Sequence, residues 1–235
     1  RQLSAQEIRK IAAEKNELEK TVRETVFERF HTTTGESLTG REEIAASILV
    51  GYVRKILEKD ENFAPFTVSE LEKNLVIPIE IVCNGNPVKI KMGGIVDRID
   101  SVAGKLRILD YKTGDVSMEI KSVESLFDEK NRNRPGEWLQ LLVYCEILCG
   151  ISDIKSYPVI YAVRNLSYPG FSGRLSIKSS AGEQELYDYS VIKDSFRASL
   201  IQLIEKIFSP SENFYMTAER NRCSFCPYNL LCLRN

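Results

Sequence analysis

The stretch 93–114 constrains the fold of this chain more than any other part of the sequence. It consists of two mainly apolar segments that are separated by a turn containing Ala103-Gly104. Two such segments around a Gly-containing turn predict a β-hairpin. Each segment carries one aspartate, Asp97 or Asp110, so the hairpin is expected to bring two carboxylates onto neighbouring strands.

Lys112 follows Asp110 by two positions and is therefore expected on the same face of its strand. Mg²⁺ prefers hard oxygen ligands and usually takes one or two protein carboxylates beside water and substrate phosphate. A neighbouring lysine would hold or polarise the attacking water in phosphodiester hydrolysis. An isolated Asp-x-Lys also occurs on ordinary solvated hairpins, so the surrounding motifs have to decide between these two interpretations.

The composition describes one globular domain, or one domain with an appendage. The chain has 235 residues, of which 43% are hydrophobic and 28% charged, and its net charge is -1. This balance argues mildly against a nucleic-acid binder, although clustered acids that hold cations would mask local positive charge. No apolar run is long enough to span a bilayer, and the six irregularly spaced cysteines favour a reducing cytoplasm over a disulfide framework.

Two helices are expected ahead of the strands. Apolar residues at three- and four-residue steps predict a long helix over 4–30, and a second helix is expected to begin near Thr39-Gly40. Glu43 lies in the first turn of the second helix, where the helix dipole alone would explain it. His31, the only histidine, is either a partner of the preceding helix end or a ligand.

An antiparallel meander is expected next. The sequence predicts a short capped helix over Thr67–Lys73 and then strands over 75–83, 88–100 and 105–111. Glu80 falls within the apolar first strand, where a buried carboxylate needs a partner or a metal. It is therefore either an outward-facing strand residue or a third acid of the site.

The segment after Gly114 contains a candidate phosphate-binding loop. A helix is expected over 117–127, and a polar stretch over 128–134 follows it. This stretch is either a solvated loop or a loop that contacts phosphate through its three basic residues. These are Lys130, Arg132 and Arg134.

A strongly amphipathic helix is expected over 136–149. Gln140 and Tyr144 are four residues apart and so lie one turn above the other on a shared face. Strands over 154–163 and 170–178 would extend the meander to a sheet of about five strands, and a last long helix follows.

The C-terminus carries three cysteines with the spacing of metal ligands, Cys223-x2-Cys226-x5-Cys232. A tetrahedral zinc or an iron-sulfur cluster needs a fourth ligand. The remaining cysteines and His31 lie in other parts of the chain, so the missing ligand is expected among them or upstream of Arg1. The alternative is that the three cysteines are incidental.

Taken in order, the motifs resemble the RecB-type branch of the PD-(D/E)XK nucleases, and most of all the nuclease domains of AddB-type helicase-nuclease subunits and the iron-sulfur nucleases of CRISPR systems. The motifs are Glu80, Gly94-x2-Asp97-Arg98-x-Asp100, Asp110-Tyr111-Lys112-Thr113-Gly114, Gln140-x3-Tyr144 and the terminal cysteines. The resemblance implies an α/β (α+β) restriction-endonuclease-like core, with a mixed sheet of about five strands flanked by helices. It also implies Mg²⁺- or Mn²⁺-dependent cleavage of DNA, usually exonucleolytic and biased to single strands, and a 4Fe-4S cluster.

The resemblance implies a role for each residue of this chain that matches a motif of the family. Asp97 and Asp110 would bind the metal, Lys112 would orient the water, and Gln140 with Tyr144 would support the site and the DNA strand. Glu80 is carried as a further catalytic and metal-binding candidate.

Two positions depart from the family pattern. The family usually has a metal-binding histidine in a Gly-x3-His motif ahead of the sheet, but counting from Gly40 this position is Ile44. Either Glu43 substitutes for this histidine, or His31 is recruited, or the first helix contributes nothing. The upstream cysteine of the AddB-like members is also absent from the chain.

These features together lead to one expectation and two rivals. We expect a helical arm over 1–35 and a nuclease domain over 36–235 with a cysteine segment over 220–235, as a C-terminal piece of a larger cytoplasmic protein. Its partners would be DNA ends, mostly single-stranded, and a helicase subunit or domain, with no membrane. The rivals are a noncatalytic DNA-binding or structural module that retains the fold, and a zinc-binding interaction domain.

Overall fold

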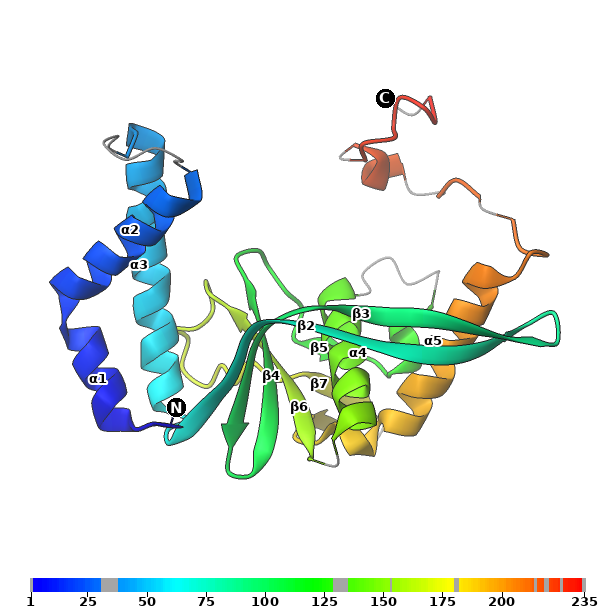
Figure 1. Ribbon diagram of the computed structural model, residues 1–235, viewed down its shortest axis with the longest axis horizontal. Coiled ribbons are helices and arrows are strands. Elements are labelled where there is room, and N and C mark those ends of the chain that lie inside the picture. Colours follow the sequence, from blue (N-terminus) through cyan, green and yellow to red (C-terminus); the bar gives the residue numbers. More distant parts are fainter. Residues whose placement is uncertain are drawn as a thin grey trace.

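A computed structural model shows a central sheet with helices on both sides (Figure 1). The structure describes residues 2–30, 38–128, 135–152, 154–179, 182–213, 215–217, 220–224 and 226–233. Within these ranges, no helix combines the length and the apolar character that crossing a membrane requires. The architecture confirms the predicted mixed α/β, restriction-endonuclease-like core with a five-stranded mixed sheet.

The N-terminal part consists of a two-residue strand and three helices. Strand β1 (Gln2–Leu3) precedes α1 (Ala5–Ala13), α2 (Lys15–Phe30) and α3 (Gly40–Glu61). The predicted single helix over 4–30 is wrong, because the backbone leaves helical geometry at Glu14. The predicted start of the next helix is confirmed, since Thr39 and Glu42 form a capping box there.

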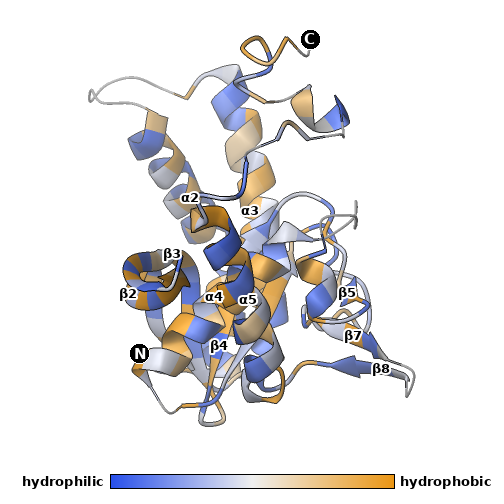
Figure 2. Ribbon diagram, turned by 90° about the vertical axis from the view of Figure 1, so that its right-hand side faces the viewer, coloured by the Kyte–Doolittle hydropathy of each residue, from blue (hydrophilic) through white to orange (hydrophobic). Residues whose placement is uncertain are grey.

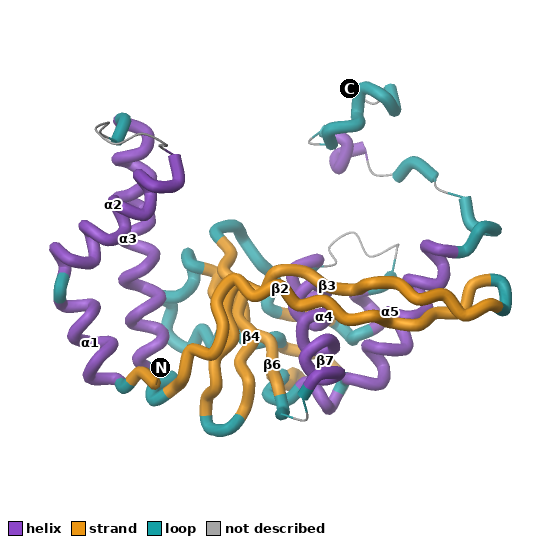
Figure 3. The backbone as a smooth tube through the Cα atoms, in the orientation of Figure 1, coloured by secondary structure: helices purple, strands orange, loops and turns teal. Residues whose placement is uncertain are grey.

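The five-stranded sheet has the order β1-β2-β3-β4-β6. Strands β2 (Phe66–Cys83), β3 (Asn86–Val102) and β4 (Lys105–Lys112) form the predicted antiparallel meander. Strand β6 (Ser156–Ala162) runs parallel to β4 and makes the sheet mixed. Figure 3 shows that β2 and β3 continue far beyond the other strands as a long hairpin arm.

Two predicted helices are wrong. The segment 67–73 belongs to β2, where pairing with β3 overrides the local capping signal. The segment 117–127 forms the short strand β5 (Glu119–Ile120) and the 3-10 helix η1 (Glu124–Leu126).

The fifth strand of the main sheet is β1 and not the predicted strand over 170–178. That segment contributes β7 (Ser176–Ser179), which pairs with β5 and with β8 (Gly182–Glu185) in a separate three-stranded sheet.

The main core lies between the sheet and two helices, α4 (Gly136–Ile151) and α5 (Lys193–Phe208). Figure 2 views the hairpin arm end-on, with α4 and α5 beside it. The predicted apolar residues of α4 are confirmed as buried, and they are Trp138, Leu141, Leu142, Cys145 and Leu148. The predicted strong amphipathicity is wrong, because Tyr144, Glu146 and Ile147 are buried as well. Two further 3-10 turns, η2 (Tyr189–Val191) and η3 (Arg220–Cys223), complete the described elements.

Successive side chains along the central strands point to opposite faces of the sheet. On β4, Ile108 points into the α4 core, while Leu109 joins a second cluster with Tyr52 and Ile56 of α3. A strand that is buried on both faces has little freedom to shift, because a one-residue slip would exchange its two sets of contacts. The register of β4 is therefore fixed by its packing on both faces.

Truncation of Leu142 tests this description of the core. Leu142 is fully buried, so Leu142→Ala should lower the free energy of unfolding by about 2–5 kcal/mol in urea denaturation. The control is Ile151→Ala at the end of the same helix, where the side chain is 60% exposed and the change should stay within about 0.5 kcal/mol. Equal losses in the two variants would contradict the assigned packing of α4.

Candidate active site

The site forms where β3 and β4 separate. The two strands pair from Val102 opposite Lys105 to Arg98 opposite Leu109, and the ladder ends there. Asp97 is the next residue on β3, and Asp110 is the next residue on β4. Beyond this point β3 continues with β2 into the arm, while β4 stays paired with β6. Both predicted carboxylates therefore lie at the fork between the strands.

At the fork, the carboxylate of Asp97 takes the place of the backbone carbonyl that a paired strand would supply. Its Oδ2 accepts a hydrogen bond from the backbone N–H of Tyr111 at 2.9 Å. This N–H lies on β4 just past the last paired residue, where β3 no longer supplies a carbonyl. The bond holds the half-buried Asp97 side chain next to the backbone of Asp110.

Asp110 is almost fully buried and lies beside Lys112. The residue is 3% exposed, and Lys112 Nζ lies 2.7 Å from its Oδ2. Burial raises the pKa of the Asp110 carboxyl above its ordinary value, and the charges of Asp97 and Glu137 raise it further, against the effect of Lys112. The fork thus concentrates negative charge in a place with little water.

The donor set fits a hard divalent cation. Oδ2 of Asp110 is buried and lies 2.7 Å from Lys112 Nζ, and the carboxylate has further lone pairs with which it can bind a cation. Within the described ranges, no three Asp, Glu, His or Cys side chains gather closely enough to hold an ion. Two carboxylates are nevertheless the usual protein contribution to a Mg²⁺ site, in which waters and substrate phosphate fill the other positions. Asp97 and Asp110 would hold such a divalent cation here.

Helix α4 fastens β3 just ahead of Asp97. Gln140 Nε2 donates to the hydroxyl of Tyr144 at 3.0 Å, and this hydroxyl donates to the backbone carbonyl of Ile95 at 2.9 Å. A Cβ at Gly94 would lie 2.8 Å from the same hydroxyl, so only glycine permits this approach. The predicted Gln140-x3-Tyr144 motif therefore lies against the strand that carries Asp97.

The sequence analysis did not consider Glu137, whose charge raises the pKa of the Asp110 carboxyl. It lies in the first turn of α4 and acts electrostatically on Asp110. Its spacing of three residues from Gln140 and seven from Tyr144 puts it on the same helix face, which was the available signal.

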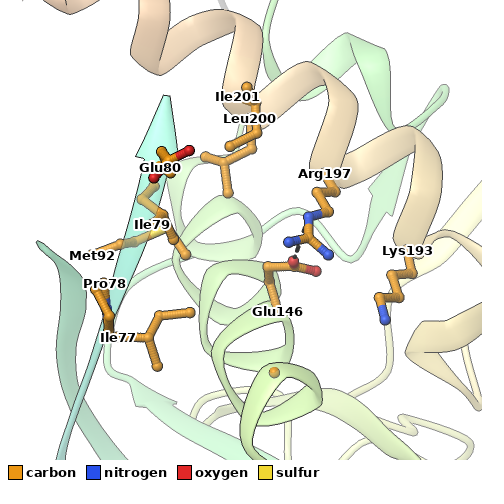
Figure 4. A pocket seen from close by; sticks show the side chains of 11 residues that line it. Ile77, Pro78, Ile79, Glu80, Met92, Glu146, Lys193, Arg197, Leu200 and Ile201 are labelled. Carbon is orange, nitrogen blue, oxygen red and sulfur yellow. Dashed lines mark ion pairs between the residues drawn. The ribbon is translucent and has the colours of Figure 1, made fainter. Parts of the chain in front are cut away.

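Glu80 lies away from the fork. It pairs with Lys89 in the outer part of the arm, whereas Asp97 lies near the base of the arm. Figure 4 shows Glu80 at a pocket of about 480 Å³ between the arm, α4 and α5, where Glu146 and Arg197 form an ion pair. The exposed side chain of Glu80 needs no metal partner, because it remains in contact with water. The structure does not bring Glu80 together with Asp97 and Asp110.

Glu43, a candidate ahead of the sheet, is also not brought to the fork. Glu43 lies in the first turn of α3 and forms an ion pair with Arg23 of α2. The residues of α3 that pack near the site, Tyr52 and Ile56, are several turns farther along the helix. His31 lies outside the described residues, and so do the basic residues Lys130, Arg132 and Arg134.

The three C-terminal cysteines form no ligand group among the described residues. Cys223 is buried, Cys226 is half-buried and Cys232 is exposed. The backbone N–H of Cys226 donates to the carbonyl of Cys223 at 3.0 Å, so the chain turns sharply between the first two cysteines.

Comparison with known proteins identifies the family. A family profile described as the PD-(D/E)XK nuclease superfamily matches residues 1–233. The crystal structure of SSO0001 aligns over 93% of this chain and 96% of its own, at 16% identity and a TM-score of 0.28, and carries no weight in the assignment. A search of curated proteins found no match. The family match supports a nuclease-type function of the kind that generally uses divalent metals. The chain belongs to the PD-(D/E)XK nuclease superfamily.

Proposed function

We propose that this chain is a Mg²⁺- or Mn²⁺-dependent deoxyribonuclease that degrades DNA from its ends. The observation that carries the proposal is the strand fork, where Asp97 and Asp110 meet with Lys112 beside them. A divalent cation held by two carboxylates, with a lysine beside it, would position and activate a water for phosphodiester hydrolysis. An almost buried carboxylate with a raised pKa also supports a functional site, because such groups gather there.

Each residue has a distinct role in this proposal. Asp97 and Asp110 hold the divalent cation, which supplies an acidified water and stabilises charge on the leaving oxygen when bound. The half-exposed Lys112 orients the water or the scissile phosphate from the open side of the fork. Tyr144 fixes β3, and the exposed Gln140 faces the entering DNA strand.

The wider biological setting is proposed from the resemblance of the motifs. We place the chain in an AddB-like helicase-nuclease of DNA repair and recombination in the cytoplasm, acting mainly on single-stranded ends. Its partners would be DNA and a helicase subunit or domain. The basic residues of the 128–134 stretch are proposed to contact phosphate.

Asp110→Asn tests the catalytic assignment. The variant replaces a charged carboxylate ligand by a neutral amide of nearly the same volume. Mn²⁺-dependent degradation of end-labelled single-stranded DNA should therefore fall by about 10²-fold or more. Asp115→Asn is the matched control, because Asp115 is the nearest following acid and its side chain is 95% exposed. This control should keep wild-type activity.

The outcome separates the proposal from its rivals. Activity that survives Asp110→Asn would remove the fork as the site. DNA binding without cleavage by the wild type would favour a noncatalytic module, and stoichiometric bound zinc would favour an interaction domain.

The raised pKa of Asp110 generates a second prediction. The folded state keeps the proton of the Asp110 carboxyl to higher pH than the unfolded state does. The free energy of unfolding therefore falls as pH rises from the pKa of this carboxyl in the unfolded state to its higher pKa in the folded state. At neutral pH the ionised carboxylate therefore destabilises the cation-free fold. In EDTA, Asp110→Asn should melt at a higher temperature than wild type, and this difference should shrink as pH falls toward the ordinary carboxyl pKa of about 3.9.

With divalent cations in place of EDTA, wild type should melt at a higher temperature than Asp110→Asn. Excess Mn²⁺ should raise the melting temperature of wild type and leave Asp110→Asn unchanged, because only the wild type retains both carboxylates. A variant that is less stable than wild type in EDTA at neutral pH would contradict the assigned effect of burial.

We further propose that Cys223, Cys226 and Cys232 bind a 4Fe-4S cluster once a fourth ligand is available. The sharp turn between the first two cysteines supports this, since it suits two ligands of one centre. Protein purified without oxygen should contain iron and absorb visible light, and Cys226→Ala should lose both signals. Cys83→Ala, at the end of β2, is the control. Iron-free protein with bound zinc would overturn this assignment.

A further inference from the structure

Four charged side chains are buried on the face of the sheet opposite α4. They are Asp60 at the end of α3, Arg98 and Asp100 on β3, and Arg107 on β4, with side-chain exposures of 4%, 7%, 0% and 0%. We call these four residues the ion cluster. Two acids and two bases make it neutral overall, which allows it to remain charged inside the protein.

The ion cluster is closely hydrogen-bonded. Arg98 donates from Nε to Asp100 Oδ1 at 2.8 Å and from Nη1 to Asp60 Oδ2 at 2.6 Å. Arg107 donates from Nε to Asp100 Oδ2 at 3.0 Å and from Nη2 to Asp60 Oδ1 at 3.3 Å. Each carboxylate therefore bridges both guanidinium groups, and this arrangement joins α3, β3 and β4 in one fixed geometry.

Stability alone is a poor explanation for such a cluster. Burial by itself lowers the pKa of Arg98, but Tyr111 and the two aspartates raise it well above the ordinary value, so the group stays cationic. Buried ion pairs often contribute no more stability than apolar residues of similar volume would. Their distinctive effect is to fix the geometry of the groups bonded to them, and Tyr111 is one of these groups.

Tyr111 connects the ion cluster to the candidate active site. Its hydroxyl accepts a hydrogen bond from Arg98 Nη1 at 3.1 Å, and its backbone N–H donates to Asp97 Oδ2 at 2.9 Å. Tyr111 lies between Asp110 and Lys112 in the chain, and Arg98 directly follows Asp97. Two hydrogen bonds of one residue thus link a buried guanidinium on one side of the sheet to a cation ligand at the fork.

We infer that Arg98 and Tyr111 are positioning residues that hold Asp97 and the segment 110–112 in their cation-binding arrangement. The inference rests on the proposed function. Anchoring of the ring by Arg98 limits rotation of the Tyr111 peptide, and the N–H of this peptide holds the Asp97 carboxylate. Loss of the anchor would let the two carboxylates separate at the point where β3 leaves β4.

Tyr161 on β6 provides a matched control. Its hydroxyl donates to Asp60 Oδ1 at 2.8 Å and accepts from Arg107 Nη1 at 3.1 Å, so it is bonded to the same ion cluster. Its ring packs edge-on against Tyr111 at 6.0 Å. Tyr161→Phe therefore removes at least as much buried hydrogen bonding as Tyr111→Phe, but from a residue that does not touch Asp97.

The experiment measures Mn²⁺ binding by isothermal titration calorimetry, together with the Mn²⁺ concentration that half-saturates cleavage. Tyr111→Phe should weaken Mn²⁺ binding by about 10–100-fold, as loss of residues that orient metal ligands typically does. Tyr161→Phe should bind Mn²⁺ like wild type. Urea denaturation of both variants shows whether their stability losses are comparable, and Arg98→Lys provides a second variant that keeps the charge but loses the geometry of the guanidinium.

The possible results have separate meanings. Equal Mn²⁺ affinity in wild type, Tyr111→Phe and Arg98→Lys, with binding lost in Asp110→Asn, would overturn the positioning role and leave the proposed function intact. Equal weakening in Tyr111→Phe and Tyr161→Phe would reduce the ion cluster to a structural role and overturn the inference. Absence of Mn²⁺ binding by wild type would overturn the proposed function and the inference with it.

Discussion

The separation of β3 from β4 is the constraint on which the rest of the site depends. A continuous ladder would pair Asp97 and Asp110 across the sheet and leave the backbone N–H of Tyr111 to a carbonyl. Because the ladder ends at Arg98 and Leu109, this N–H bonds to the Asp97 carboxylate. The same divergence frees β3 to follow β2 into the arm.

The two faces of the sheet stabilise the fork in different ways. On one face, α4 contributes apolar packing and the Tyr144 hydroxyl, which binds β3 at Ile95. On the other face, the ion cluster ties the end of α3 to both strands through charged hydrogen bonds. Apolar contacts tolerate small shifts, whereas hydrogen bonds between charged groups have stricter directions. The charged face is thus suited to set the geometry and the apolar face to supply stability.

Sequence patterns within a few residues predicted the strands and helices whose formation depends on neighbouring residues. Two mainly apolar segments around a Gly-containing turn identified β3 and β4, and helical periodicity identified α4, because these signals lie within a few residues of one another. The segment 67–73 was misread because its strand state comes from pairing with 96–101, far along the chain. Glu80 was weighed as a site acid because the motif order said nothing of distance along the arm, and Glu137 was missed although it shares the helix face of Gln140.

The sequence by itself determined the chemistry of this protein: which residue types are present, their order, and hence Asp97, Asp110 and Lys112 as candidates on two strands of one hairpin. These follow from side-chain identity and the two-residue period of a strand. Only the tertiary structure decided where the ladder ends, which acids meet, and that Arg98 and Tyr111 connect the fork to a buried ion cluster. Such contacts join α3, β3, β4 and β6, and their geometry depends on how separate elements pack, which no local pattern encodes.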